Sequence, residues 1–395
     1  MKNRKDRIRV VHLITKMELG GAQINTLYTF ESLDHSIFET FLLSGDGGLL
    51  NEKVKKKDGF FIIPDLIRNI HPVRDIKAFF QIRKRLKTIK PHILHTHSSK
   101  AGFLGRLAGF FGKIPVTIHS VHGFSFSPFH LYLKRFIYSR IEKIAAPFTT
   151  HFIFVSQQDI QTARQLKLIA NNFSLIRSGF PAKEFEKPAL SMVALRKTYN
   201  ISKDDFVCGI IAPFKPQKSL HHIIEIAAMI AKSTKNIVFF IAGDGELREE
   251  LEVEIRKRNL EHYFRMPGFV FDIASVIELF DCGLSCALWE GLPQSIVQMR
   301  IKKKPVVVSD IPGHREIIKN NQNGFLVKIG DYEQFKEKIL FLKRHPEKAM
   351  KIGQFQDDYS EWKAENMVIK QQDLYIKLVE KYTRNEASTQ SCKKH

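Results

Sequence analysis

The segment WEGLPQSIVQM (289–299) joins a carboxylate, Glu290, to the start of a predicted helix. An apolar strand precedes it, so the backbone N–H groups of Leu292, Gln294 and Ser295 are expected at the helix N-terminus. A helix N-terminus has partial positive charge and unused donors, which suit a pyrophosphate. The segment therefore predicts a site for a phosphorylated ligand with an acidic side chain beside it.

Glycine turns and a lysine occupy three further strand-to-helix connections. Gly243 and Gly245 follow an apolar run, and they allow a tight turn with close approach of the backbone to a ligand. Gly20 and Gly21 stand between the first strand and the first helix, in a turn shorter than the G-x-G-x-x-G dinucleotide fingerprint. Lys218 lies just before a helix, in PFKPQK. These turns favour contact with phosphate groups or with an acceptor.

Histidines gather at the ends of two predicted strands. His95 and His97 flank one strand end and Lys100 follows; these three either bind an acceptor or structure the loop. His122 comes directly after the next strand. The pairs in HTH and HSVH are alternate residues on strands rather than the His-x3-His spacing of a helical metal site. We expect no metal cluster and no metal cofactor.

Two sets of alternating strands and helices must position these residues. Short apolar runs separated by helices indicate parallel sheets covered on both faces. The first set contains RVVHLIT (9–15), ETFLLS (39–44), FFIIPD (60–65), HILHTH (92–97), VTIHSVHG (116–123) and HFIFVS (151–156). The second contains FVCGIIA (206–212), NIVFFIAGDG (236–245), YFRMPGFV (263–270), DCGLSCALWEG (281–291), KPVVVSD (304–310) and NGFLVKIG (323–330).

The alternation predicts an α/β fold of two Rossmann-like, doubly wound domains that face each other across a cleft. The stretch 179–205 has prolines and scattered charges, and we place the connection there. The expected domains are residues 1–185 and 186–365. Residues 366–382 are expected to form a helix that returns to the first domain, and residues 383–395 a disordered tail.

Composition limits the class of protein. The chain has 395 residues with an ordinary apolar share of 44%, which excludes a disordered chain and a small disulfide scaffold. No apolar run approaches the roughly 18 residues of a transmembrane helix, and the first run is too short for a signal peptide. The four cysteines form no Cys-x-x-Cys pair, and we interpret them as reduced thiols in a cytoplasmic protein.

The net charge of +21 is distributed unevenly. Residues 1–200 contain 32 Lys and Arg against 14 Asp and Glu, or +18, whereas residues 201–395 contain 30 against 27, or +3. Such asymmetry indicates a negatively charged partner for the first half of the chain.

From Gly20 to about Tyr375 the chain resembles the retaining glycosyltransferases of family 4, which have the GT-B fold. Nine segments in the expected order support the resemblance: GGAQ (20–23), HTHSSKAGFLGRLAG (95–109), VHG (121–123), VSQ (155–157), PFKPQK (213–218), IAGDGELR (241–248), PGFVFD (267–272), WEGLPQSIVQM (289–299) and PVVVSDIPGHREII (305–318).

The resemblance implies roles for particular residues. Glu290 would bind hydroxyls of the donor sugar, and Lys218 would neutralise the diphosphate leaving group. His122 would contact the transferred sugar. The second carboxylate of the family's Glu-x7-Glu pattern, which grips the ribose, is Gln298 here, so this contact loses its charge assistance. The arginine that usually accompanies the lysine is Pro213 here.

The same resemblance defines two binding sets. The residues expected to bind the donor are Gly21, Gly243, Gly245, Leu247 (against the base), Gly268, Phe269 (base edge), Leu292, Pro293, Gln294, Ser295 and Gln298. The residues expected to bind the acceptor are Gly20, His95, His97 and Lys100.

The implied reaction moves a hexose-type sugar from a UDP- or GDP-linked donor to a glycan, with retention at the anomeric carbon and without metal. Aromatic residues accompany Lys134, Arg135, Arg140 and Lys143 in the segment 124–148, and 74–90 is a basic helix. Basic helices with aromatics suit an anionic membrane. We therefore expect a lipid-linked acceptor and a protein peripheral on the cytoplasmic face of the inner membrane.

Two alternatives remain open. A sugar-nucleotide epimerase can share this fold but needs carboxylates placed to remove a sugar proton. A catalytically degenerate relative, marked by Gln298 and Pro213, would act as a binding protein, and nucleic acid would then explain the charge. The aromatics do not form a recognisable RNA-binding motif, so no nucleic acid is expected.

Overall fold

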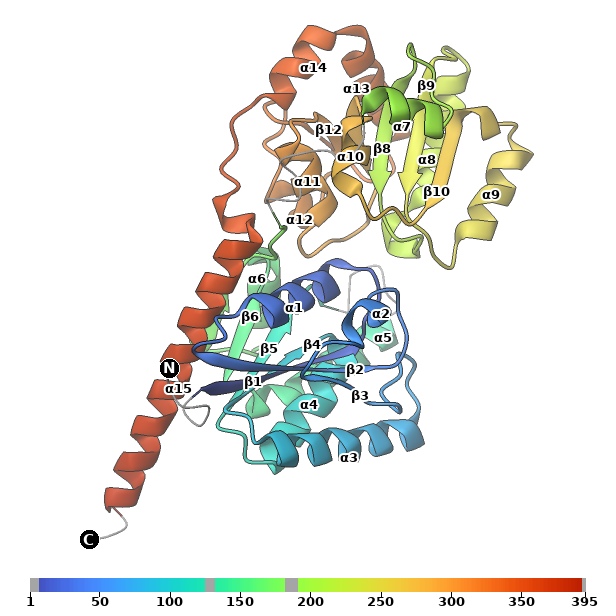
Figure 1. Ribbon diagram of the computed structural model, residues 1–395. Helices are drawn as coiled ribbons and strands as arrows, with labels where there is room; N and C mark the ends of the chain where they lie inside the picture. The colour runs from blue at the N-terminus through green and yellow to red at the C-terminus, as the bar shows by residue number, and fades with distance from the viewer. Residues whose placement is uncertain (1–6, 125–131, 182–190, 393–395) are drawn as a thin grey trace. The chain divides into compact units, whose positions relative to one another are not determined.

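The computed structural model describes residues 7–124, 132–181 and 191–392 of the chain. It divides into two compact units (Figure 1). Unit 1 comprises Met1–Gly179 and Glu361–His395, and unit 2 comprises Phe180–Ser360. The predicted boundary at 185/186 lies outside the described residues.

Unit 1 is built on a parallel sheet whose described strands number seven, in the order β3-β2-β1-β4-β5-β6-β7. The strands are β1 (Ile8–Lys16), β2 (Phe38–Gly45), β3 (Phe60–Ile62), β4 (Ile93–His97), β5 (Val116–Val121), β6 (His151–Phe154) and β7 (Phe173–Leu175). Its helices are α1 (Gly21–Ser32), α2 (Asn51–Val54), α3 (Pro72–Ile89), α4 (Ser99–Phe111), α5 (Tyr132–Ala145), η2 (Ala146–Phe148), α6 (Gln157–Gln165) and α15 (Ala364–Cys392).

Alternating side chains of β1 enter two different cores, because successive residues of a strand point to opposite faces of the sheet. Val11 and Leu13 pack with α3 and α4. Val10 packs instead with Met367 and Tyr375 of α15. Helices therefore cover both faces of this sheet, as the near-continuous apolar strands predict.

The C-terminal helix α15 belongs to unit 1 although it comes last in the chain. Met367, Val368, Tyr375 and Leu378 are buried in one core with β1, β4 and β5. Burial of each such side chain contributes about 1.5–3 kcal/mol, which explains why the helix is held there. The helix continues to Cys392, past the expected end at residue 382.

Unit 2 repeats the architecture with a second parallel sheet; among described residues its order is β10-β9-β8-β11-β12-β13. The strands are β8 (Phe206–Ile211), β9 (Ile237–Ala242), β10 (Phe264–Gly268), β11 (Cys282–Ser285), β12 (Val306–Ser309) and β13 (Phe325–Val327). The helices are α7 (Met192–Thr198), η4 (Pro216–Lys218), α8 (Leu220–Ala231), α9 (Arg248–Lys257), η5 (Glu261–Tyr263), α10 (Ile273–Glu278), α11 (Gln294–Ile301), α12 (Pro312–Arg315), α13 (Tyr332–Arg344) and α14 (Pro346–Gly353); η6 (Ser360–Trp362) precedes α15.

Both sheets have the strand order of Rossmann-like domains, and the predicted fold class of two such units is confirmed. In each sheet the order reverses beside the first strand, between β1 and β4 in unit 1 and between β8 and β11 in unit 2. Ligands of open α/β sheets bind at the carboxyl ends of strands next to such a reversal. The loops that follow β1, β4, β8 and β11 are therefore the expected ligand-binding positions.

Candidate active site

Lys218 and Glu290 meet at the reversal of strand order in unit 2. β8 and β11 pair directly, and both strands end at the same edge of the sheet. The loop after β8 leads through η4 to Lys218, and the loop after β11 leads to Glu290. Nζ of Lys218 contacts Oε1 of Glu290 in an ion pair. The two residues predicted from separate motifs thus share one location.

Gln217 joins the same two loops. Its Nε2 donates to the backbone oxygen of Trp289 at 2.6 Å and lies 3.3 Å from Oε2 of Glu290. The side chains of Lys218 and Glu290 are only 16% and 10% exposed. Charges in such a shielded setting interact more strongly than they would in bulk water, so an anionic ligand here would feel Lys218 strongly.

Pro213, in the position of the usual family arginine, contributes no cation to this site. Nearby Arg248 is engaged elsewhere, since it pairs with Asp244 and Glu252 at 2.8 and 2.9 Å. Its guanidinium also lies over the ring of Phe214, 5.1 Å from the centroid.

Helix α11 begins beside Glu290. Its N-cap residue is Pro293, which has no side-chain oxygen with which to cap the first amides. Leu292, Gln294, Ser295 and Gln298 are half-buried, as residues beside a ligand would be. Gly313 of α12 packs under this turn, where a Cβ would lie 2.7 Å from the backbone oxygen of Glu290. The helix therefore begins where the sequence predicts, next to Glu290, and phosphate binding at this end stays a prediction.

The Gly-Asp-Gly turn after β9 packs against the loop that follows β8. Gly243 has φ of +146°, and a Cβ there would lie 1.9 Å from the backbone oxygen of Ala212. The N–H of Phe214 donates to the oxygen of Asp244 at 2.9 Å. Glycine at 243 is therefore required by protein packing, and Gly245 likewise lies against Phe214.

The remaining residues predicted to contact the base lie near this turn. The N–H of Gly243 donates to the oxygen of Gly268 at 2.8 Å, which ties the ends of β9 and β10 together. Phe269 follows and is 41% exposed, so its ring is open to a ligand. Leu247 packs against the core of unit 2.

His314 of α12 is a candidate that the sequence analysis missed. It is fully buried, and its Nδ1 lies 2.6 Å from the backbone oxygen of Ser309, to which it donates. Burial lowers the pKa of His314 to about 4, so the ring is neutral. Glu290 and Lys218 both act on it electrostatically. The sequence feature that could have identified His314 is its place in the first turn after β12, the strand next to β11.

In unit 1 the glycine pair lies at the start of α1. Gly21 is the first residue of the helix and Gly20 its N-cap, in an extended conformation. A Cβ on Gly20 would come within 2.7 Å of Oε1 of Gln23. Both glycines follow β1, one of the two strands at the reversal of this sheet. The predicted turn therefore lies at the position where open α/β sheets bind their ligands.

His97 and His122 are linked through their rings. Nδ1 of His97 lies 3.3 Å from Nε2 of His122, and Nε2 of His97 lies 3.2 Å from Nδ1 of His12. Burial lowers the pKa of His122 to about 4 and that of His12 to about 3. These histidines are therefore neutral at pH 7. His12 was not predicted as a site residue, because the apolar run that contains it is typical of a strand in the core of a sheet.

His95 and Lys100 make polar contacts within unit 1. His95 is fully buried, and its two ring nitrogens lie 2.6 Å from the Tyr375 hydroxyl and 2.7 Å from Oγ of Ser120. Lys100 contacts the Asn69 backbone oxygen and pairs with Asp75 at 2.6 Å. These contacts are consistent with a role in structuring the loop, and acceptor binding by His95 and Lys100 stays a prediction.

His12, His95 and His97 bring ring nitrogens within 4.8 Å of one another, which is close enough to consider a metal. No such cluster was predicted from the sequence, because its residues come from two strands that are far apart in the chain, β1 and β4. The donor set fits poorly, since both nitrogens of His95 already have hydrogen-bonding partners. The expectation of a reaction without metal stays a prediction.

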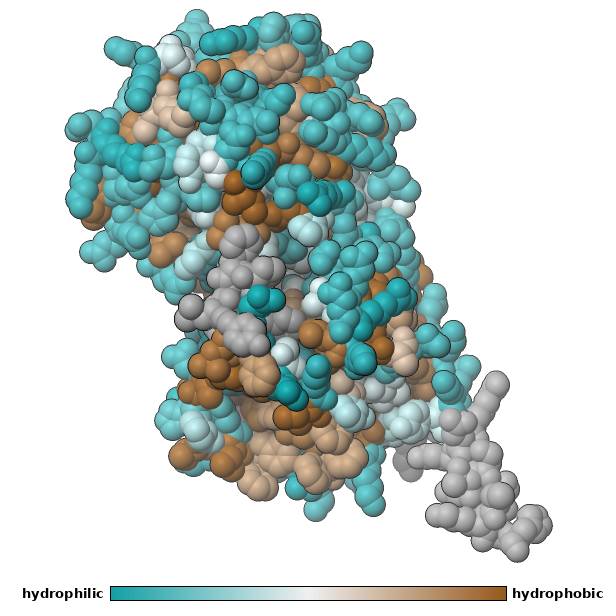
Figure 2. All heavy atoms as spheres, turned by 180° about the vertical axis from the view of Figure 1, so that it is seen from behind, coloured by the Kyte–Doolittle hydropathy of each residue, from teal (hydrophilic) through white to brown (hydrophobic). Residues whose placement is uncertain are grey.

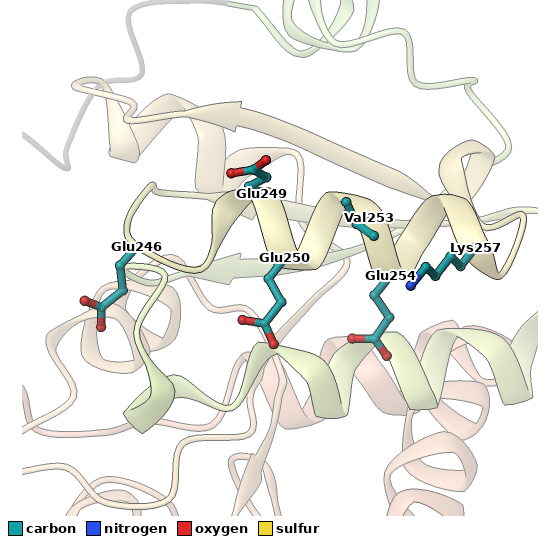
Figure 3. Close-up of a pocket in the computed structure, with 6 residues that line it drawn as sticks. All are labelled: Glu246, Glu249, Glu250, Val253, Glu254 and Lys257. Atoms are coloured by element: carbon teal, nitrogen blue, oxygen red, sulfur yellow. The ribbon is translucent and has the colours of Figure 1, made fainter.

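A pocket on α9 has a lining unsuited to a nucleotide. Glu246, Glu249, Glu250 and Glu254 line it together with Val253 and Lys257 (Figure 3). Figure 3 shows Glu250 and Glu254 pointing from α9 toward α8, where Glu254 bonds His221 at 2.6 Å. Four carboxylates repel a diphosphate, so this pocket is not a donor site.

Unit 1 also exposes aromatic and basic side chains together. A groove between the ends of α3 and α4 is lined by Phe80, Phe111, Arg83, Lys84, Lys87 and Lys113, among others. We call these six residues the basic groove. Phe80 and Phe111 are 58% and 57% exposed, and Figure 2 shows apolar side chains at the surface of this unit. Among the described helices, none has the length and apolarity to cross a bilayer.

Two family descriptions match the chain, one in each half. Residues 20–183 match "Glycosyltransferase Family 4", and residues 193–357 match "Glycosyl transferases group 1". A UDP-Gal:alpha-D-GlcNAc-diphosphoundecaprenol alpha-1,3-galactosyltransferase of Escherichia coli is 31% identical over 340 residues, which cover 85% of this chain and 88% of that protein.

A second relative acts on a similar class of substrate. The N,N'-diacetylbacillosaminyl-diphospho-undecaprenol alpha-1,3-N-acetylgalactosaminyltransferase of Campylobacter jejuni is 27% identical, covering 80% of this chain and 84% of that protein. Among solved structures, HepE of Anabaena with UDP-glucose has a TM-score of 0.76 at 17% identity and covers 97% of this chain and 100% of that one. This likeness shows the shared fold.

Proposed function

Because this chain belongs to the family 4 glycosyltransferases with the GT-B fold, we propose that it moves a hexose-type sugar from UDP to a lipid-linked glycan with retention of configuration. Its relatives are glycosyltransferases of lipid-linked sugars, and the chain is a glycosyltransferase of polysaccharide synthesis. The observation that carries the finer proposal is the Lys218–Glu290 pair beside the start of α11.

Unit 2 would hold the donor. The name of the Escherichia coli relative includes UDP-Gal, and HepE was solved with UDP-glucose, which favours UDP over GDP. A diphosphate carries more negative charge than Glu290 and would compete for Lys218. Glu290, freed from its partner, would then accept hydrogen bonds from sugar hydroxyls. Gln298 would bond the ribose through its amide.

Transfer would proceed on one face of the sugar. The bond from the anomeric carbon to the diphosphate oxygen breaks while a bond to the acceptor oxygen forms on the same side. The acceptor proton passes to the departing diphosphate oxygen. Negative charge then grows on the diphosphate, and Lys218 and the first amides of α11 would stabilise it. We propose that this pair of features replaces a metal ion.

Unit 1 would hold the acceptor near Gly20 and His122. The named relatives act on diphosphoundecaprenol-linked sugars, which are membrane lipids with a negative diphosphate. The basic groove and the exposed Phe80 and Phe111 would favour an anionic membrane surface. We therefore propose peripheral attachment to the cytoplasmic face of the inner membrane. Residues 125–131 of the aromatic segment 124–148 lie outside the described residues.

A transfer assay tests the proposal. The full chain is incubated with UDP-galactose, UDP-glucose, UDP-N-acetylhexosamines or GDP-mannose, and with an undecaprenyl-diphosphate sugar in detergent. We expect transfer from a UDP donor, an α-anomeric product by NMR, and unchanged activity in EDTA. The variant Glu290→Gln should bind UDP normally and lose transfer. Binding of UDP-sugars by wild-type protein without any transfer would instead support the degenerate relative.

A further inference from the structure

Three imidazoles in unit 1 form a continuous row. Nδ1 of His12 lies 3.2 Å from Nε2 of His97, and Nδ1 of His97 lies 3.3 Å from Nε2 of His122. They meet because β4 pairs in parallel with both β1 and β5. His12 lies within β1 opposite His95, His97 ends β4, and His122 directly follows β5. We call these residues the histidine row.

The proton positions in the row depend on one another. Burial lowers the pKa of each imidazole, so all three are neutral at pH 7. A neutral imidazole has one N–H donor and one bare acceptor nitrogen. Each of the two contacts needs one donor and one acceptor. The tautomer of any one ring therefore determines the tautomers of the other two.

The two ends of the row decide its direction. Within the described residues, Nε2 of His12 and Nδ1 of His122 are buried without a hydrogen-bond partner. In one direction His12 leaves a bare nitrogen in the core and His122 carries its proton on Nδ1, where the described residues supply no acceptor. In the other direction His12 buries an N–H that has no acceptor. Each direction thus leaves one buried N–H without an acceptor among the described residues. His12 is fully buried within β1, where a ligand cannot supply an acceptor, whereas His122 is half-buried and follows β5. A ligand oxygen can therefore satisfy the N–H only in the first direction, which favours that direction.

We propose that His12 and His97 are positioning residues that hold His122 in its Nδ1–H tautomer, ready to donate a hydrogen bond to an oxygen of the transferred sugar. This inference rests on the proposed function, in which His122 contacts that sugar. A histidine's tautomer is commonly set by the partner of its other nitrogen. Nε2 of His12 has no partner among the described residues that could receive a proton, so the row is not a path for proton conduction.

His95 strengthens the arrangement without joining the row. Its ring lies 4.2 Å from that of His97, between centroids, while its own nitrogens bond Ser120 and Tyr375. Tyr375 comes from α15 and is fully buried. The C-terminal helix therefore fixes His95, and His95 limits the movement of His97.

The test reads the tautomer directly. The full chain is labelled with nitrogen-15 in histidine, and long-range nitrogen–proton spectra are assigned with single substitutions. We expect wild-type His122 to be protonated on Nδ1. His12→Leu removes the donor to His97, so His122 should shift toward the Nε2–H form that free histidine prefers. His12→Asn keeps an amide donor near the place of Nδ1 and should preserve the wild-type tautomer.

Kinetics provide the second readout. His12→Leu should lower kcat about tenfold, the value of one hydrogen bond. The affinity for UDP should stay unchanged, because UDP lacks the transferred hexose that His122 would contact. His12→Asn should stay within about threefold of wild type. His119→Leu is the matched control, since His119 is equally buried on β5 but bonds Thr96 outside the row. It should leave the tautomer of His122 unchanged.

Three results would overturn the inference: an Nε2–H tautomer of His122 in the wild type, a wild-type tautomer and kcat in His12→Leu, or equal losses in His12→Leu and His12→Asn. Absence of sugar transfer by wild-type protein would refute the proposed function instead, and the ligand-free spectra would still decide on the row. If His12→Leu does not fold, the wild-type spectrum decides on the tautomer alone.

Discussion

At the scale of single residues, the ion pair between Lys218 and Glu290 concentrates the charge of unit 2 at one loop junction. The pair is 72 residues apart in sequence and is shielded from solvent. In the proposed reaction Lys218 changes partner from Glu290 to the diphosphate. An interaction that strengthens as charge develops on the leaving group accelerates the reaction.

Replacement of this lysine tests that role. We expect Lys218→Met to lower kcat/KM for transfer by about 10²–10³-fold, as the loss of one preorganised group that stabilises developing charge does. The fold should persist, because Gln217 still bonds Glu290 and Trp289. Steady-state transfer assays and thermal melting measure both effects. Lys232→Met, an exposed lysine at the end of α8, is the control; activity of Lys218→Met within threefold of wild type would contradict the assignment.

At the scale of elements, the turn after β9 depends on a glycine for packing. A side chain at Gly243 would collide with the backbone oxygen of Ala212, and the local φ of +146° is unfavourable for other residues. We expect Gly243→Ala to lower the free energy of unfolding of unit 2 by about 1–3 kcal/mol or more. Urea denaturation measures the change.

A second glycine provides the comparison for that measurement. Gly330 also has positive φ, but its Cβ position has open space around it. Gly330→Ala should therefore cost about 1 kcal/mol, the strain of the backbone alone. Equal losses for Gly243→Ala and Gly330→Ala would show that the contact with Ala212 does not matter.

The helices α3 and α4 carry the proposed membrane contact. We expect Arg83→Glu with Lys84→Glu to weaken binding to vesicles of phosphatidylglycerol by roughly tenfold or more, because each basic residue near an anionic surface contributes about 1 kcal/mol. Vesicle sedimentation at several salt concentrations measures the loss. Lys232→Glu with Lys257→Glu makes the same charge change on unit 2. If both pairs weaken binding equally, net charge and not the basic groove is responsible.

At the scale of the whole molecule, buried histidines are distributed unevenly. The pKa values of His12, His95, His97, His119 and His122 in unit 1 are all lowered, chiefly by burial. In unit 2 His314 is buried in the same way. Protonation of such rings favours the unfolded chain, in which the pKa is near 6.5. Their contribution to stability is complete above pH 6.5 and is lost as the pH falls toward the folded values, about 3 for His12 and 4 for His122.

Unit 1 should therefore lose stability with acid more steeply than unit 2. Each histidine contributes a slope of up to about 1.4 kcal/mol per pH unit below pH 6.5. The sequence offers one tryptophan reporter for each unit, Trp362 in unit 1 and Trp289 in unit 2. Trp289→Phe leaves Trp362 as the reporter of unit 1, and Trp362→Phe leaves Trp289 as the reporter of unit 2. Urea denaturation of both variants at pH 7.5 and 5.5 measures the stability of each unit. Equal losses of unfolding free energy in the two units between pH 7.5 and pH 5.5 would contradict the expectation.

The sequence by itself determined the two Rossmann-like units and the order of the motifs. Alternation of apolar strands with helices is a local pattern, and the strands predicted from it include β1, β4, β8 and β9 of the structure. The helix start beside Glu290 was likewise visible, because Pro293 and the preceding apolar strand are sequence neighbours.

Only the tertiary structure decided which side chains meet. Lys218 reaches Glu290 and His12 reaches His97 because strand order, which no local pattern encodes, makes β8 adjacent to β11 and β1 adjacent to β4. The same order, together with the return of α15, gives His95 its partners Ser120 and Tyr375. Contacts between residues far apart in the chain follow from the packing of whole elements. A sequence motif can therefore identify a candidate functional residue, but its neighbours in space are known only from the fold.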